Sequence, residues 1–238
     1  GDNAGLLRPV LSKANPYLQN QLDANTSEGN SFNANGFAEI TFLKNFKFTW
    51  NSGVNVDETR STSTTNPYYG SYASSNGMVD KVHVRNMSWN HQQLLTWEQS
   101  FNDHNIYAMV GHEYYRSKYY YLYASKSNQF DPTNSELSSA ITDKSGNSYT
   151  TDYNTEGFFG RLMYDYDGKY HASVSYRRDA SSRFHPDNRW GNFWSASAAW
   201  VISKEDFFKA DWVDMLKIKA SYGEQGNDQI GNYRYTNI

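Results

Sequence analysis

Hydrophobic and polar residues alternate with a period of two over residues 156–202. Successive side chains of a β-strand point to opposite faces, so this period predicts strands rather than helices. In residues 156–166 one set of alternate positions is apolar, and the other set carries Arg161 and Asp165. The apolar set consists of Phe158, Gly160, Leu162, Tyr164 and Tyr166. The pattern predicts a strand with one hydrophobic and one polar face.

The same alternation resumes after Asp167-Gly168, a dipeptide typical of two-residue hairpin turns. Tyr170, Ala172, Val174 and Tyr176 form the apolar set of the next strand, and His171, Ser173, Ser175 and Arg177 the polar set. Residues 192–202 continue with Trp194, Ala196, Ala198, Trp200 and Ile202 against Ser195 and Ser197. We therefore predict an antiparallel hairpin followed by a further strand of the same sheet.

Five more strands are predicted elsewhere in the chain. They cover residues 36–42, residues 46–51, a stretch within 82–98, a stretch from Ile106, and residues 216–222. Residues 1–35 show little periodicity, and we expect loop or irregular structure there. Residues 203–215 are expected to form a short amphipathic turn or helix.

The predicted connections alternate between short and long. Short turns are expected near 43–45, 102–105 and 167–168, and long polar connections over 57–79, 125–155 and 179–190, with an intermediate one at 203–215. Outer-membrane barrels have this asymmetry, because their periplasmic turns are short and their extracellular loops are long. The pattern favours an antiparallel up-and-down transmembrane β-barrel.

Charged residues in the predicted strands fall opposite the apolar set. They are Glu39, Lys47, Arg161, Asp165, His171, Arg177, Lys217 and Lys219. An Arg or Lys facing lipid at the bilayer midplane costs about 2–4 kcal/mol, so a lipid-facing set should lack them. We predict that the apolar set faces lipid and the charged set faces the lumen. A soluble, aromatic-rich β-sandwich that binds glycans is the alternative, because its strands would alternate in the same way.

Composition excludes several classes of protein. Hydrophobic residues make up 38% of the 238 residues, yet 17% are aromatic, which argues against a disordered chain. The net charge of −3 provides no basic surface for nucleic acid. Cysteine is absent, which removes disulfides and thiolate sites. No run approaches the roughly 18 apolar residues of a membrane-spanning helix.

The sequence offers few candidates for chemistry. The six His residues show no ligand spacing with Asp or Glu, and no pair of carboxylates can be singled out, so we expect no metal, no cofactor and no enzyme activity. Candidate substrate-binding residues are Tyr119, Tyr120 and Tyr121, and also Arg183, Asp187 and Arg189. Alternatively, the tyrosines form an interfacial aromatic girdle, and residues 183–189 form a salt-bridged turn.

Three stretches carry a resemblance to a known family. Residues 177–195 (RRDASSRFHPDNRWGNFWS), 200–208 (WVISKEDFF) and 216–233 (LKIKASYGEQGNDQIGNY) resemble consecutive blocks in the barrel of SusC/RagA-type TonB-dependent outer-membrane transporters. Two positions depart from the family pattern: Ala180 stands where Gly is usual, and Trp194 where Pro is common. The resemblance is clear over residues 156–235.

The resemblance implies that residues 1–238 are about eight strands of a barrel of about 22 strands. We expect the signal peptide, TonB box and plug domain of the family to lie outside these residues. The implied function is active import of oligosaccharides or peptides across the outer membrane of a Gram-negative bacterium. The implied partners are a SusD-type surface lipoprotein, the TonB–ExbB–ExbD complex acting through a plug, and outer-membrane lipid.

Overall fold

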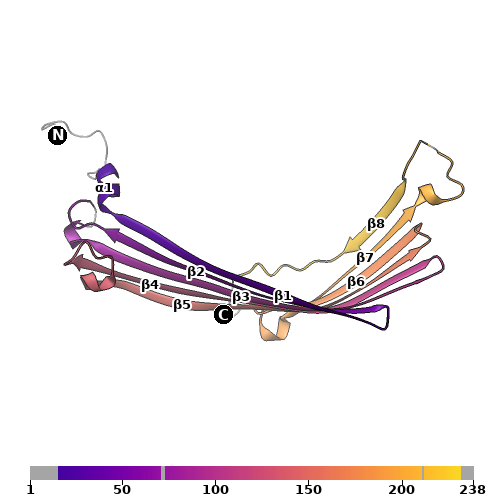
Figure 1. Ribbon diagram of the computed structural model, residues 1–238, viewed down its shortest axis with the longest axis horizontal. Coiled ribbons are helices and arrows are strands. Elements are labelled where there is room, and N and C mark those ends of the chain that lie inside the picture. The colour runs from indigo at the N-terminus through magenta and orange to yellow at the C-terminus, as the bar shows by residue number, and fades with distance from the viewer. Residues whose placement is uncertain (1–15, 71–72, 211, 232–238) are drawn as a thin grey trace. The chain divides into compact units, whose positions relative to one another are not determined.

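The computed structural model describes residues 16–70, 73–210 and 212–231, and these form one antiparallel sheet of eight strands in chain order (Figure 1). The strands are β1 (Ala24–Phe42), β2 (Phe46–Thr65), β3 (Met78–Phe101), β4 (His104–Gln129), β5 (Ala140–Tyr166), β6 (Tyr170–Ser181), β7 (Trp190–Val201) and β8 (Lys217–Gly223). The order confirms the predicted up-and-down topology, with β1 and β8 at the edges.

Helices are few and short in the described part of the chain. They are α1 (Pro16–Leu22) and four 3₁₀ turns: η1 (Ala73–Ser75), η2 (Leu137–Ser139), η3 (Pro186–Asn188) and η4 (Ile202–Lys204). None of these helices has the length and apolar character needed to cross a bilayer.

The chain divides into two compact units, and each strand from β1 to β5 contributes to both. The first unit contains residues 1–32, 56–86 and 119–151, and the second contains residues 33–55, 87–118 and 152–238. The second unit includes β6, β7, β8 and every tight turn between consecutive strands. The two units are described separately below.

The tight turns lie where the sequence predicts them. Asp167 and Gly168 have φ values of 53° and 59°, the left-handed pair that a type I′ hairpin turn requires. Leu43 and Lys44 have φ values of 48° and 62°, although neither is a residue that favours this region. The β3–β4 turn has Asn102 at φ 50°. Each turn reverses the chain within two or three residues and sets the register of its hairpin.

Three predicted loops are partly strand. Residues 24–35 belong to β1, β2 continues to Thr65, and β5 begins at Ala140, so the predictions for 1–35, 57–79 and 125–155 are wrong over these parts. Residues 1–15 lie outside the described residues. Both faces of these stretches are polar, so no hydrophobic alternation marks them. Their side chains bond across strands instead: Ser31 donates to Asp57 at 2.6 Å, and the Ser27 and Ser61 hydroxyls lie 3.1 Å apart.

The loop asymmetry persists in shortened form. The connections at 66–77, 130–139 and 182–189 are longer than the tight turns at 43–45, 102–103 and 167–169. The connection at 202–216 is the exception, because it is long but joins the same ends of the strands as the tight turns. Residues 203–215, expected as an amphipathic turn or helix, contain the end of η4 and further turns.

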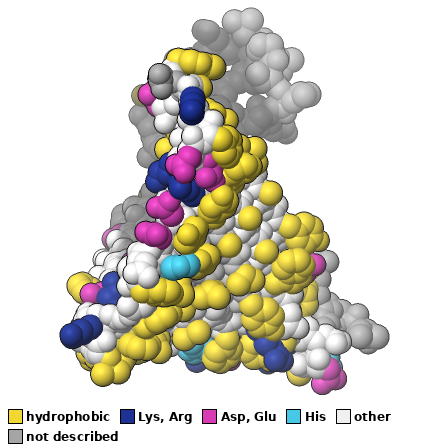
Figure 2. All heavy atoms as spheres, turned by 90° about the vertical axis from the view of Figure 1, so that its right-hand side faces the viewer, with side chains coloured by type: hydrophobic (Ala, Val, Ile, Leu, Met, Phe, Trp, Pro, Cys, Tyr) yellow, Lys and Arg dark blue, Asp and Glu magenta, His cyan; other side chains and the backbone are white. Residues whose placement is uncertain are grey.

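Hydrophobic side chains are more exposed than the polar ones beside them. Along β6 and β7, apolar side chains such as Tyr170, Val174 and Trp194 are exposed, and their polar neighbours are half-buried. Leu162 and Val174 pair in register and are each 47% exposed, which confirms that they lie outside a closed core. Buried hydrophobic residues in the described ranges are Val79, Ala140, Ala180 and Val201. Figure 2 shows hydrophobic side chains over much of the face in view and charged side chains in separate groups.

Candidate functional site

The apolar face of β5–β8 carries two aromatic rows, which the strand register aligns. The row beside the Asp167–Gly168 turn contains Tyr166, Tyr170 and Trp200, whose ring centroids are 6.3 Å apart at each step. The second row lies toward the other ends of the strands and contains Phe158, Tyr176, Trp190, Trp194 and Tyr222. Small and aliphatic residues dominate the strip between the rows: Leu162, Ala172, Val174, Ala196, Ala198 and Ala220.

The outer limits of the two rows lie about as far apart as the apolar band of a membrane is thick. Trp190, the member of the second row farthest from the first, and Trp200 lie ten residues apart on β7, and ten residues of strand span about 34 Å. A strand tilted by about 40° would convert this length to roughly 26 Å, close to the apolar band of about 25 Å that outer-membrane barrels present to lipid. Aromatic girdles flank that band in such barrels. We call this surface the apolar belt.

The opposite face of the same strands is polar and internally bonded. The hydroxyl oxygens of Ser173 and Ser197 lie 2.7 Å apart, and those of Ser175 and Ser195 2.6 Å apart. Further along β6 the Arg177 guanidinium forms ion pairs with Asp179, at 2.7 Å, and with Glu113 of β4. Arg177 therefore ties β4 to β6 across β5. The predicted polar set does share one face of the sheet.

A pocket of about 550 Å³ opens at the end of this polar face. Its lining includes Glu113, Arg177, Asp179, Arg189, Phe193 and Asp228. Acidic, basic and aromatic side chains thus converge on one open space, an arrangement suited to a polar ligand with apolar surfaces.

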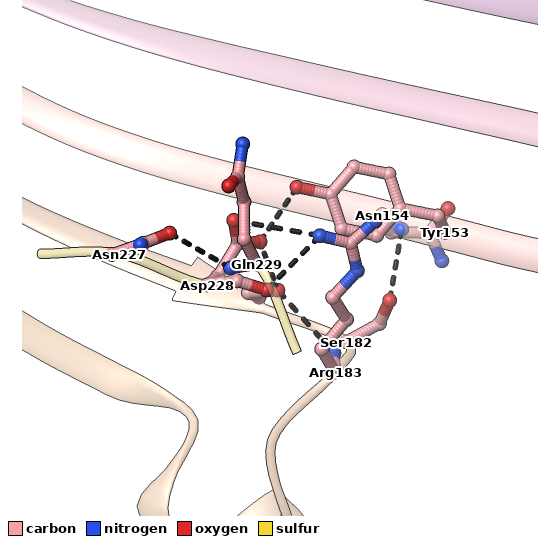
Figure 3. A network of polar contacts seen from close by, with 8 residues as sticks. Tyr153, Asn154, Ser182, Arg183, Asn227, Asp228 and Gln229 are labelled. Atoms are coloured by element: carbon pink, nitrogen blue, oxygen red, sulfur yellow. Dashed lines mark hydrogen bonds and ion pairs between the residues drawn. The ribbon is translucent and has the colours of Figure 1, made fainter. Parts of the chain in front are cut away.

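Asp228 anchors the segment that follows β8 to the loop that follows β6 (Figure 3). Its carboxylate accepts hydrogen bonds from the Tyr153 hydroxyl at 2.6 Å and the Ser181 hydroxyl at 2.7 Å. The Arg183 guanidinium lies 3.7 Å from the same carboxylate, donates to the Asp228 carbonyl at 3.0 Å and sits 4.2 Å above the Tyr153 ring. The Asn154 backbone N–H donates to Ser182 beside them. We call Tyr153, Ser181, Arg183 and Asp228 the loop anchor.

The loop anchor shifts the acidity of two of its members. Burial, together with the hydrogen bond to Asp228 and its charge, raises the pKa of Tyr153 to about 12. Burial alone would raise the pKa of Asp228, but hydrogen bonds from Tyr153 and Ser181 and the charge of Arg183 hold that pKa below its usual value. The carboxylate is therefore ionised and the phenol neutral at ordinary pH.

This coupling predicts loss of the loop anchor at alkaline pH. A phenol with a raised native pKa contributes stability that is complete below about pH 10, its unfolded pKa, and is lost as pH rises toward 12. Subtracting the tyrosinate absorbance titration of Tyr153→Phe from that of the unchanged protein should leave one tyrosine with a midpoint near 12. Asp228→Asn should lower that midpoint. A midpoint near 10 in the unchanged protein would contradict the arrangement.

The structure separates the candidate tyrosines. Tyr119 and Tyr121 of β4 both lie near the Tyr149 ring of β5, with centroid distances of 6.1 and 5.1 Å. Tyr120, whose side chain points to the other face, meets the His83 ring edge-on at 5.9 Å. Tyr119 and Tyr121 therefore form one aromatic cluster in the first unit, and Tyr120 does not belong to it.

The three candidates after β6 also have different surroundings, all in the second unit. Arg183 belongs to the loop anchor, and Arg189 lines the pocket. The Asp187 side chain is 84% exposed and lies 3.4 Å from His185. Sequence reasoning missed Glu113, Tyr153 and Asp228 as site residues. Asp228 is far along the chain from its partners, and its Gly-Asn-Asp setting indicates only a turn.

Within residues 16–70, 73–210 and 212–231, no group of three or more His, Asp or Glu side chains is arranged to hold a metal ion.

Known proteins similar to this chain include TonB-dependent receptors and a peptide transporter. No family model matches it. It is 33% identical to TonB-dependent receptor P39 of Formosa agariphila over 147 residues, which are 60% of this chain and 14% of that protein. It is 28% identical to TonB-dependent receptor SusC of Bacteroides thetaiotaomicron over 93% of this chain and 22% of that protein.

Solved structures of a peptide transporter are also similar to this chain. The RagAB peptide transporter superposes with a TM-score of 0.85 and 29% identity, over 92% of this chain and 25% of the transporter chain. The open-open state of the RagAB peptide importer matches with the same score and identity. The chain spans less than a quarter of the length of these curated relatives.

Proposed function

We propose, because this chain belongs to the SusC/RagA-type family of TonB-dependent transporters, that it forms part of the wall of an outer-membrane β-barrel that imports large nutrients. Relatives in this family are named as receptors and transporters, and none of those reported above is named as an enzyme. The activity of the whole protein would be TonB-dependent import in a Gram-negative bacterium, and this chain would supply about eight strands of a barrel of about 22 strands.

The exposed apolar belt is the observation that carries the proposal. A sheet in water hides its apolar face against another layer, but the described residues form a single sheet whose apolar face is open. Lipid is the solvent that favours such a face, because burying it there removes the hydrocarbon from water. A soluble glycan-binding sandwich would need a second sheet over Leu162 and Val174. The described residues form one sheet and leave both side chains exposed, which supports the barrel instead.

The polar face would then line the lumen, with the tight turns in the periplasm and Arg183–Trp190 outside the cell. We propose two separate cargo contacts: Arg189 at the pocket in the second unit, and the aromatic cluster of Tyr119 and Tyr121 in the first unit. Arg183, through the loop anchor, would hold the pocket wall, whereas Asp187 and Tyr120 would lie beside these contacts. The pocket's mixture of carboxylates, guanidinium groups and aromatic rings suits oligosaccharides or peptides.

Two relatives support the proposed partners. SusC is named as a TonB-dependent receptor, and RagAB is named as a peptide importer. We propose that this chain works in the same kind of assembly. That assembly would include a SusD-type surface lipoprotein over the extracellular loops. The TonB–ExbB–ExbD complex would act through a plug domain contributed by the rest of the transporter.

Fractionation and uptake test the proposal together. The full-length transporter should be recovered in the outer membrane, require detergent for extraction and migrate faster on SDS gels before boiling than after it. Cells lacking it should fail to grow on one oligosaccharide or peptide from a panel that supports the parent strain. A folded, soluble monomer formed by the isolated 238-residue chain would overturn the barrel assignment.

A further inference from the structure

Arg178 is an exception to the segregation of charge described above. Among the residues paired in the β5–β8 register, it is the basic residue that shares a face with Phe158, Tyr176 and Trp194. Its register neighbours are Phe158 on β5 and Asn192 on β7. A guanidinium on an otherwise apolar surface needs water or an anion close by.

No side chain among the described residues accepts a hydrogen bond from the Arg178 guanidinium. The guanidinium carbon lies 5.1 Å from the centroid of the Trp190 ring, and the Trp190 and Phe158 centroids are 6.1 Å apart. Within the described ranges, no carboxylate is within ion-pair distance of Arg178. The nearby carboxylate of Glu156 is engaged by His112 at 3.1 Å. A guanidinium carries five N–H donors in a planar fork, and here it lies over an aromatic ring.

The depth of Arg178 places it at one boundary of the apolar belt. Tyr170 in the first aromatic row and Arg178 lie on the same strand, and eight residues of strand cover about 27 Å. With a tilt of about 40°, the height above Tyr170 is roughly 21 Å, near the limit of an apolar band of about 25 Å. An Arg costs about 2–4 kcal/mol at the midplane but only about 0–1 kcal/mol near the interface.

We propose that Arg178, supported by Trp190, binds the phosphate group of a lipid in the outer leaflet. The inference rests on the proposed function, which puts this end of β6 at the outer surface of the membrane. A guanidinium recognises phosphate through two parallel N–H donors, and an indole is favoured at the membrane interface. The open fork, the aromatic support and the continuity with the apolar belt together favour a lipid phosphate over a soluble anion.

Lipid binding by the purified full-length transporter tests the site. The protein is incorporated into nanodiscs of phosphatidylcholine, and retention of phosphorylated lipid A is measured by native mass spectrometry. Dephosphorylated lipid A serves as the matched lipid. Arg178→Ala should weaken retention of the phosphorylated form about fivefold, the factor given by about 1 kcal/mol for a basic side chain at an anionic lipid surface. Retention of the dephosphorylated form should not change.

Arg161→Ala is the matched control, because it removes the same charge from the polar face of the adjacent strand. It should leave lipid A retention unchanged. Equal retention by Arg178→Ala and the unchanged protein overturns the site. Displacement of lipid A by excess inorganic phosphate overturns the assignment to a lipid.

A nitroxide attached at Val174→Cys separates this inference from the proposed function. Frequent collision with oxygen, together with unchanged lipid A retention in Arg178→Ala, overturns the Arg178 site alone. Infrequent collision with oxygen shows that the apolar belt does not meet lipid, and this overturns the proposed function.

Discussion

Replacing Leu162 by Arg is expected to destabilise the barrel in membranes and to lower the fraction of it that folds there. Leu162 lies between the two aromatic rows and is 47% exposed, so the new charge would face the middle of the hydrocarbon. The expected loss in the free energy of unfolding is about 2–4 kcal/mol. Urea titration of the full-length protein folded into lipid vesicles measures this loss, and heat-modifiable migration on SDS gels measures the folded fraction.

Met163→Arg is the matched control for that variant. Met163 is the adjacent residue on β5, is 43% exposed and pairs with Ser173 on the polar face. The same charge there would point into the lumen, where water hydrates it, so the free energy of unfolding should change by less than about 0.5 kcal/mol. Equal losses for the two variants, or no loss for Leu162→Arg, would contradict the assignment of faces.

Replacing Arg177 by Ala is expected to destabilise the polar face. The Glu113 and Asp179 side chains are 38% and 32% exposed, and the substitution would leave both carboxylates without the guanidinium that they share. Removing one partner of a fully buried ion pair costs about 3–5 kcal/mol, but these groups are partly hydrated, so we expect about 1–2 kcal/mol. The midpoint of urea unfolding in detergent checks this value.

Two further variants identify the cause of that loss. Glu113→Gln and Asp179→Asn, introduced together with Arg177→Ala, should recover most of the stability because they remove the uncompensated charges. Arg178→Ala, the same substitution one residue along β6, removes no ion pair from the described residues and should have little effect in detergent. If the triple variant is as unstable as Arg177→Ala, charge compensation is not the role of Arg177.

The sheet near the tight turns was predictable because its signals are local. Alternation at period two identifies each strand and its apolar face, and Asp167-Gly168 selects the turn that sets the β5–β6 register. The assignment of Leu162 and Val174 to one open face needed nothing more. Recognition of the family depended likewise on contiguous stretches, at 177–195, 200–208 and 216–233.

The distal parts of the strands gave no such signal. Residues 24–35 and 140–155 are polar on both faces, and they are held by cross-strand contacts such as Ser31 to Asp57. A turn-forming composition predicts loops there, because pairing with a neighbouring strand leaves no periodic mark on a polar segment. The run of tyrosines after Tyr114 was ambiguous for the same reason, and the strand pairing placed Tyr119 and Tyr121 on one face.

Local patterns determined which strands form and which of their faces is apolar, since side-chain alternation and turn geometry act within a few residues. The three-dimensional pairing decided how far the polar strands extend and which residues meet at the pocket. Tyr153 and Asp228 are 75 residues apart in sequence and join only because β5 and the segment after β8 converge on the same loop. Contacts at that separation depend on the whole sheet, so no stretch of the sequence contains them.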